Sequence, residues 1–312
     1  IYRNRDSGEF VLFGPPPQAE SFNSPIRLEP ITMEYRMKKE TQIISGVILC
    51  IASGVSFASC KDISWDALNT AVQQAVAAGK ETGGYSLNMW ATVVDETGTV
   101  CHVTTSGTPG ASAGNSEWLG SRVISAQKAN TANAFSLDGY AISTANLYSA
   151  VQPGGSLFGL QESNPVNPAI AYAGNANRYG TRVDPLVGKK IGGVNVFGGG
   201  LALYSGSKKI GALGVSGDTS CRDHAFAWRV RDALAMKAPG TGITTNNMNA
   251  AGVAQTPLKY KVAATPLQGD EMILGNPNDV SANYWNAWAQ PLCPNSIGAI
   301  ALPTNGTLTT LP

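Results

Sequence analysis

The sequence is poor in charged residues and very poor in histidine. Only 14% of its 312 residues are charged while 43% are hydrophobic, and this balance excludes a chain that is disordered throughout. The formal net charge of +1 gives no electrostatic basis for binding nucleic acid, which is not expected as a partner. His102 and His224 are the two histidines, so a zinc or di-iron centre built from several histidines of one chain is excluded.

Several catalytic motifs are also missing. The cysteines form no Cys-x-x-Cys pair, which argues against dithiol redox catalysis. The glycines at 198–200 fit neither a dinucleotide fingerprint nor a phosphate loop, because a strand is expected after them. The sequence Gly-Val-Ser-Gly at 214–217 lacks the spacing of a nucleophile elbow. No acid/base pair is recognised, so no catalytic residue is assigned and an enzymatic activity is not favoured.

The apolar run at 43–57 is too short for a membrane span. It holds about 15 residues, whereas a bilayer needs roughly 20. It follows the basic residues Lys38 and Lys39 and ends in small residues at Ser56 and Ala58, which is the pattern of a signal peptide over 37–59. We therefore expect a periplasmic or extracellular protein without a transmembrane span in its mature form. Residues 1–36 are interpreted as upstream sequence absent from the mature protein, or alternatively as a true extension.

Export would place the remaining cysteines in an oxidising compartment, where disulfides form. Cys60, Cys101, Cys221 and Cys293 allow three pairings. We favour Cys221 with Cys293, because the loop-rich tail needs a covalent tie and Cys221 lies at the accessible start of a helix. A Cys101–Cys221 bond is the alternative. Residues 57–60 resemble a lipobox, which would make Cys60 a lipid anchor.

Hydrophobic periodicity divides residues 62–237 into helices and hairpins, followed by a loop-rich extension at 238–312 that is expected to pack on this domain. The expected helices are 64–79, 116–135, 143–151 and 221–236, and the expected strands are 87–94, 99–104, 193–204 and 210–216. Strands joined as hairpins indicate an antiparallel sheet with helices packed on it. The proline-containing stretch 153–190 is expected to be a functional loop or an oligomer contact.

Five segments match the pattern of a known family in order: Val93–Gly98, Lys128–Ala132, Gly192–Val196, Gly211–Gly217 and Asp223–Ala227. On these segments the chain resembles the GlcG/HbpS-like haem-binding family. The resemblance implies an α/β (α+β) fold, profilin- or PAS-like, with a five-stranded antiparallel sheet flanked by helices, and a homo-oligomer. It also implies haem (heme) as the ligand of some members, haem degradation by one, and a place beside glycolate or diol metabolism for others.

Under this resemblance the last expected helix offers residues that could hold haem. His224 could ligate the iron, Trp228 could stack on the porphyrin and Arg231 could pair with a propionate. His102 is the second candidate metal ligand, and Tyr140 is an oxygen donor if no histidine serves. The alternative interpretation is that both histidines are satisfied within the fold.

Two further groups could line a ligand site. Backbone N–H groups at Gly217, Asp218, Thr219 and Ser220 open the last helix and could bind a carboxylate or a haem propionate. Alternatively the glycine only permits a tight turn, and Ser220 with the acid at 223 forms a capping box. The aromatic side chains that could line a pocket for a flat ligand, or else pack in the core or an interface, are Trp118, Tyr140, Tyr148 and Phe158.

These observations lead to three functional hypotheses. The first is an exported haem-binding protein that acts as a carrier, scavenger or sensor input. The second is a small-carboxylate-binding or enzyme-associated accessory module that uses the helix start at 214–223. The third, ranked last, is a haem-degrading enzyme.

Overall fold

The structure is a computed structural model and describes residues 2–3, 10–11, 60–77, 84–110, 118, 120–244, 259–260, 268–275, 288–291, 293 and 310–311. The expected signal peptide at 37–59 lies outside these residues and stays a prediction, as does the interpretation of 1–36. The chain divides into two compact units, Ile1–Ser53 and Gly54–Pro312. In the first unit, strand β1 (Tyr2–Arg3) pairs antiparallel with β2 (Phe10–Val11). None of the described helices combines the length and apolarity that a membrane crossing requires.

The second unit is built on a four-stranded antiparallel sheet in the order β4-β3-β6-β5. Its strands are β3 (Trp90–Asp95), β4 (Val100–Thr105), β5 (Gly200–Ser205) and β6 (Lys208–Ser216). Two hairpins, β3–β4 and β5–β6, are joined through the central β3–β6 pair. The sequence analysis therefore predicted the mixed α/β class and the antiparallel hairpins correctly.

The expected five-stranded sheet has four strands in the part of the chain that the structure describes. The strand expected at 193–204 begins only at Gly200. Gly193 has a φ of 81°, a conformation that interrupts the extended backbone a ladder requires. The profilin- or PAS-like designation stays a prediction.

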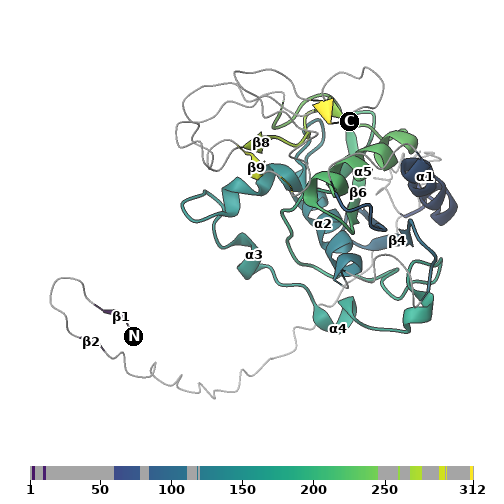
Figure 1. The fold of residues 1–312 in the computed structure, drawn as a ribbon, viewed down its shortest axis with the longest axis horizontal. Helices are drawn as coiled ribbons and strands as arrows, with labels where there is room; N and C mark the ends of the chain where they lie inside the picture. Colours follow the sequence, from purple (N-terminus) through teal and green to yellow (C-terminus); the bar gives the residue numbers. More distant parts are fainter. Residues whose placement is uncertain are drawn as a thin grey trace, which may run out of the picture. The chain divides into compact units, whose positions relative to one another are not determined.

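Three longer helices cover the two faces of the sheet. Helix α2 (Ser121–Phe135) packs against β3, β5 and β6, whereas α1 (Trp65–Ala77) packs against β4 and α5 (Ser220–Ala233) against β5 and β6. Helices α1 and α5 also contact each other (Figure 1). The expected helix at 143–151 is instead two 3₁₀ turns, η1 (Thr144–Leu147) and η2 (Ser149–Val151). The stretch 153–190 carries the short helices α3 (Leu160–Ser163), α4 (Pro168–Ala171) and η3 (Ala176–Arg178).

Strand alternation decides which residues meet which helix. On β3, Trp90 and Val94 belong to the cluster packed on α2, while Ala91 and Val93 belong to the cluster of α1 and α5. Successive side chains of a strand point to opposite faces, so a strand covered on both faces needs apolar residues at consecutive positions. This explains why β3 reads as a nearly continuous apolar run.

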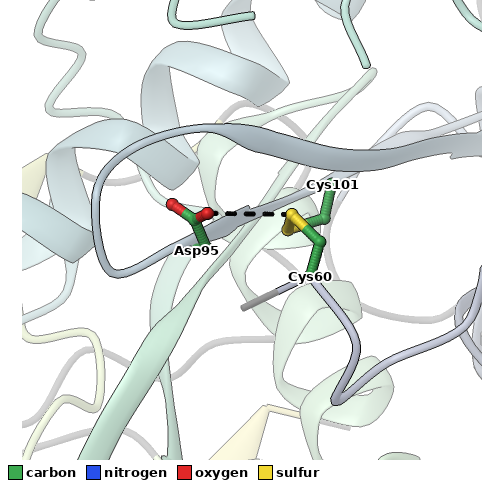
Figure 2. A group of neighbouring side chains, drawn as sticks. All are labelled: Cys60, Asp95 and Cys101. Carbon is green, nitrogen blue, oxygen red and sulfur yellow. Dashed lines mark hydrogen bonds between the residues drawn. A yellow bond between two sulfur atoms is a disulfide. The ribbon is translucent and has the colours of Figure 1, made fainter. Parts of the chain in front are cut away.

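Two disulfides connect distant parts of this unit. Cys60 is joined to Cys101 of β4, and Cys221 of α5 is joined to Cys293. Figure 2 shows the first bond beside Asp95, whose carboxylate lies 3.8 Å from the Cys60 sulfur. A lipid anchor would use this same sulfur, so the lipobox interpretation of Cys60 is incompatible with the observed bond. Both sulfurs are also unavailable as thiolate ligands, so this cluster is not a metal site.

Described parts of the C-terminal extension are anchored in the same core. Arg231 forms a fully buried, two-contact ion pair with Asp270, at 2.5 and 2.8 Å. Asn146 donates a hydrogen bond to the Glu271 carbonyl oxygen at 3.0 Å. Parallel pairs join β8 (Leu274–Gly275) with β9 (Gln290–Pro291) and β7 (Lys259–Tyr260) with β10 (Thr310–Leu311). The boundary between 62–237 and 238–312 therefore runs through closely packed structure.

Candidate functional site

A cavity of about 560 Å³ lies beside the N-terminal ends of α2 and α5. This volume falls within the usual range for small-molecule sites. Its wall comes from segments that are far apart in the sequence, since Tyr85, Trp118, Phe197 and Gln290 all contribute. The other lining residues are Gly120, Ser121, Ile124, Lys128, Tyr148, Ser216, Asp218, Thr219, Ser220, Asp223, Pro291 and Cys293.

Aromatic side chains form two pairs around this cavity. The rings of Tyr85 and Trp118 meet edge to face with centroids 5.9 Å apart, and those of Tyr148 and Phe197 lie 6.2 Å apart at a tilt. Tyr85, Trp118 and Phe197 are each between 42% and 47% exposed, which leaves large apolar surfaces in contact with water. Covering such surfaces with a flat apolar ligand is favourable because it removes aromatic area from water.

A buried ion pair lies at the polar side of the cavity. The Lys128 ammonium group of α2 donates to the Asp223 carboxylate of α5 at 2.7 Å and to the Val215 carbonyl oxygen at 3.0 Å. Desolvation lowers the pKa of Lys128 and raises the pKa of Asp223 to about 6, while the attraction between the two charges opposes both shifts. Burial therefore acts against the charged form of each group, and their mutual attraction offsets part of this cost.

The sequence analysis named Lys128 as part of a family segment and Asp223 as part of another segment and of a capping box, and did not predict their contact. A signal was present, because Lys128 is a single lysine between Ala126 and Ala129 on the buried side of a small-residue helix. Lysine is almost never fully buried unless it is paired. A buried carboxylate partner could therefore have been expected, although the sequence does not say which one.

The α5 start differs from the expected anion site. The helix begins at Ser220, and its N-cap is Thr219, whose hydroxyl accepts the Arg222 N–H at 3.4 Å. The expected capping box of Ser220 with Asp223 is wrong, because the Asp223 carboxylate accepts the N–H of Asp218 at 2.9 Å. Ser220 and Thr219 still line the cavity.

Asp218 takes the place that an external anion would occupy at this turn. Its carboxylate accepts N–H groups of Tyr85, Leu87 and Thr219 at 2.7–3.0 Å and lies 3.2 Å from the Arg222 guanidinium. Gly217 packs against the Asn88 carbonyl oxygen, where an added Cβ would approach to 2.1 Å. A second anion would face the carboxylates of Asp218 and Asp223, so this geometry disfavours the small-carboxylate hypothesis.

His224, Trp228 and Arg231 are brought together by α5, but in the core and not at the cavity. His224 is fully buried, and its Nδ1 accepts the Gly199 N–H at 3.4 Å. Burial, followed by the nearby charges of Arg231 and Lys128, lowers the pKa of His224 to about 3, so the ring is neutral. Arg231 stacks over Trp228 at 4.7 Å while it pairs with Asp270. None of the three residues lines the cavity.

The remaining sequence candidates are divided between the cavity and the rest of the fold. His102 donates from Nε2 to the Ile63 carbonyl oxygen at 2.8 Å, and burial lowers its pKa. Tyr140 lies near Tyr204, away from the cavity lining, and burial raises the pKa of its phenol, which disfavours a phenolate ligand. Trp118 and Tyr148 do line the cavity.

Two of the cavity aromatics, Tyr85 and Phe197, were missed. Tyr85 lies just before the strand expected at 87–94, and Phe197 lies in the part of the expected strand 193–204 that is irregular in the structure. Phe158, which the sequence analysis proposed, is 64% exposed and is not part of the cavity lining.

This architecture defines an α/β domain with a cavity suited to a small ligand. A family model described as "Haem degrading protein HbpS-like" matches residues 63–231, more than half of the chain. The chain belongs to the HbpS-like family, which confirms the resemblance drawn from its segments.

Solved structures with detectable similarity include protein ORFY of Klebsiella pneumoniae, with 24% identity over 55% of this chain and 90% of that one, at a TM-score of 0.36. A haem complex of PduOC has 22% identity over 54% of this chain and 89% of that one, also at 0.36. A double mutant of Streptomyces reticuli HbpS has 16% identity over 55% of this chain and 86% of that one, at 0.35. A search of curated proteins gives no match.

Proposed function

We propose that this protein binds haem in the aromatic cavity between the starts of α2 and α5. The observation that carries the proposal is the cavity itself, about 560 Å³ and walled by two aromatic pairs, in a member of the HbpS-like family. Porphyrin is flat and largely apolar, and aromatic side chains contact such surfaces face-on or edge-on. The donor atoms of the cavity fit oxygen ligation, because the phenols of Tyr85 and Tyr148 line it while the histidines lie elsewhere.

The proposal includes export and a role as carrier, scavenger or sensor input. The signal-like segment at 37–59 and the two disulfides support an oxidising compartment outside the cytoplasm. The family resemblance supports a homo-oligomer and the profilin- or PAS-like arrangement.

Haem degradation is the second candidate function. The family description favours it, and the Lys128–Asp223 ion pair places charged groups in the cavity lining. It requires dioxygen and an electron donor, so a reaction of the haemin complex with ascorbate in air tests it. Loss of the Soret band that is blocked in a Lys128→Met variant would support this function, and a stable spectrum would reject it.

Titration of the purified protein with haemin tests binding. We expect a shifted Soret band that saturates at a fixed stoichiometry. A titration that follows free haemin at all ratios would refute the proposal.

Matched aromatic variants locate the site. Phe197→Ala removes a ring that lines the cavity, whereas Phe158→Ala removes a more exposed ring that does not. We expect the first to weaken haemin binding at least tenfold and the second to leave it unchanged.

Phenol variants identify the ligand atom. Tyr85→Phe and Tyr148→Phe each keep the ring and remove the oxygen, and Tyr172→Phe is the exposed control. A change in Soret position in one of the first two variants would identify the iron ligand. A spectrum unchanged in both, and in the double variant, would exclude phenol ligation.

A further inference from the structure

Part of the cavity wall comes from outside the region that matches the family. The family match ends at residue 231, yet Gln290, Pro291 and Cys293 line the cavity. These residues come long after the cavity segment Ser216–Ser220 in the sequence. They reach the site through the folding of the C-terminal extension. A ligand in the cavity would therefore contact residues that the family pattern does not describe.

This wall is held in place by contacts on both sides. The Gln290 side-chain oxygen accepts the Gly198 N–H at 3.1 Å, and its backbone N–H donates to the Ile273 carbonyl oxygen at 2.8 Å. Trp288 packs on the apolar cluster that includes Tyr148, one of the cavity aromatics.

The far side of the wall is fixed covalently. Cys293 is bonded to Cys221 in the first turn of α5, directly after the cavity residue Ser220. Both cysteines are at least 95% buried. The disulfide therefore ties the added wall to the helix start that contributes Ser220 to the same cavity.

We infer that Gln290, Pro291 and Cys293 form a selectivity wall of the ligand cavity, and that the Cys221–Cys293 bond sets how tightly this wall closes on a planar macrocycle. The inference rests on the proposed haem-binding function. Without the bond, the wall keeps its hydrogen bonds through Gln290 but loses the tie to α5, so a bound ligand escapes more easily. A purely structural disulfide would change stability and leave ligand release unaltered.

The experiment measures haemin release from the full-length protein to excess apomyoglobin. The Cys221→Ser/Cys293→Ser variant is compared with Cys60→Ser/Cys101→Ser, which removes a disulfide that does not line this cavity. We expect release at least tenfold faster from the first variant and less than twofold changed in the second. Equal release rates in both variants and the wild type would overturn the inference.

A second variant keeps the test independent of folding defects. Pro291→Trp leaves both disulfides intact and places a large side chain in the wall. We expect it to weaken haemin binding at least tenfold, while binding of the smaller probe anilinonaphthalene sulfonate changes less. Equal losses for both probes would contradict a wall that selects by size.

Two outcomes separate this inference from the proposed function. If the wild type does not bind haemin but binds anilinonaphthalene sulfonate, and the Cys221/Cys293 variant releases that probe faster, the wall stands and the haem proposal fails. If the wild type binds haemin and both disulfide variants release it at the same rate, the haem proposal is supported and the inference about the selectivity wall is rejected. Non-reducing peptide mapping accompanies both, and a Cys101–Cys221 peptide would overturn the inference.

Discussion

The buried Arg231–Asp270 pair offers a sharp test of how the C-terminal extension is held. Both side chains are fully buried, and two contacts of 2.5 and 2.8 Å join them. The guanidinium group also donates to the Ala202 carbonyl oxygen at 3.2 Å and stacks over Trp228. Substituting Asp270→Asn keeps the size of the side chain but leaves the Arg231 charge buried without its counter-charge.

Loss of one partner from a buried ion pair costs about 3–5 kcal/mol, because the remaining charge stays desolvated. For a domain of this size, each kcal/mol lowers the melting temperature by roughly 2–4 °C. Asp270→Asn should therefore lower it by roughly 6–20 °C. The double variant Arg231→Met/Asp270→Leu removes both charges and should be markedly more stable than Asp270→Asn alone, since no uncompensated charge remains.

The matched control is the exposed Asp66–Arg182 pair. It also joins a carboxylate to a guanidinium by two contacts, but its side chains are 62% and 59% exposed. Solvent screens such pairs, so Asp66→Asn should hardly change the melting temperature. Thermal unfolding followed by circular dichroism measures all variants. Equally small effects of Asp270→Asn and Asp66→Asn would show that Arg231 does not depend on the extension.

Three further predictions concern stability. The folded-state pKa of His224, about 3, lies below its ordinary value, so its contribution is present above pH 6.5 and is lost as the pH falls towards 3. Between these pH values, the free energy of unfolding of the wild type, measured with urea, should therefore fall more steeply than that of His224→Gln, by up to about 1.4 kcal/mol per pH unit. Parallel pH profiles of the two proteins would refute this. Lys128→Met leaves the Asp223 carboxylate unpaired, so the variant should lose about 3–5 kcal/mol at pH 8 and less at pH 5, where Asp223 is protonated; a loss independent of pH would contradict the pairing. Cys60→Ser/Cys101→Ser opens a loop with a sequence separation of 41 and should lower the free energy of unfolding by about 2–4 kcal/mol, whereas an unchanged urea midpoint would argue against this disulfide.

Signals from neighbouring residues were sufficient to predict most of the helices and strands and the family. The turn at Asp95–Gly98 and the apolar runs beside it predict the first hairpin, because turn chemistry and strand alternation depend on neighbouring residues only. The Asp95 side chain accepts N–H groups of Thr97 and Thr99, which is how this turn forms. The same locality explains the errors at 143–151 and 193–199, where helix or strand propensity competes with contacts that the sequence does not display.

The role of each site residue depended on packing between distant segments. His224 at the start of a helix has the sequence pattern of a ligand, yet it is fully buried beside Gly199, and burial keeps its ring neutral. Phe197 lies in a segment that the sequence predicts as strand but that is irregular in the structure, and it reaches the cavity beside Tyr148.

The sequence by itself determined the order of the longer helices and of the two hairpins, and the family. Only the tertiary structure decided that Lys128 pairs with Asp223, which is 95 residues away, and that Gln290 lines the cavity. The physical reason is that backbone conformation follows from local sterics and hydrogen bonding, whereas burial, desolvation and ion pairing depend on which surfaces the whole chain brings together.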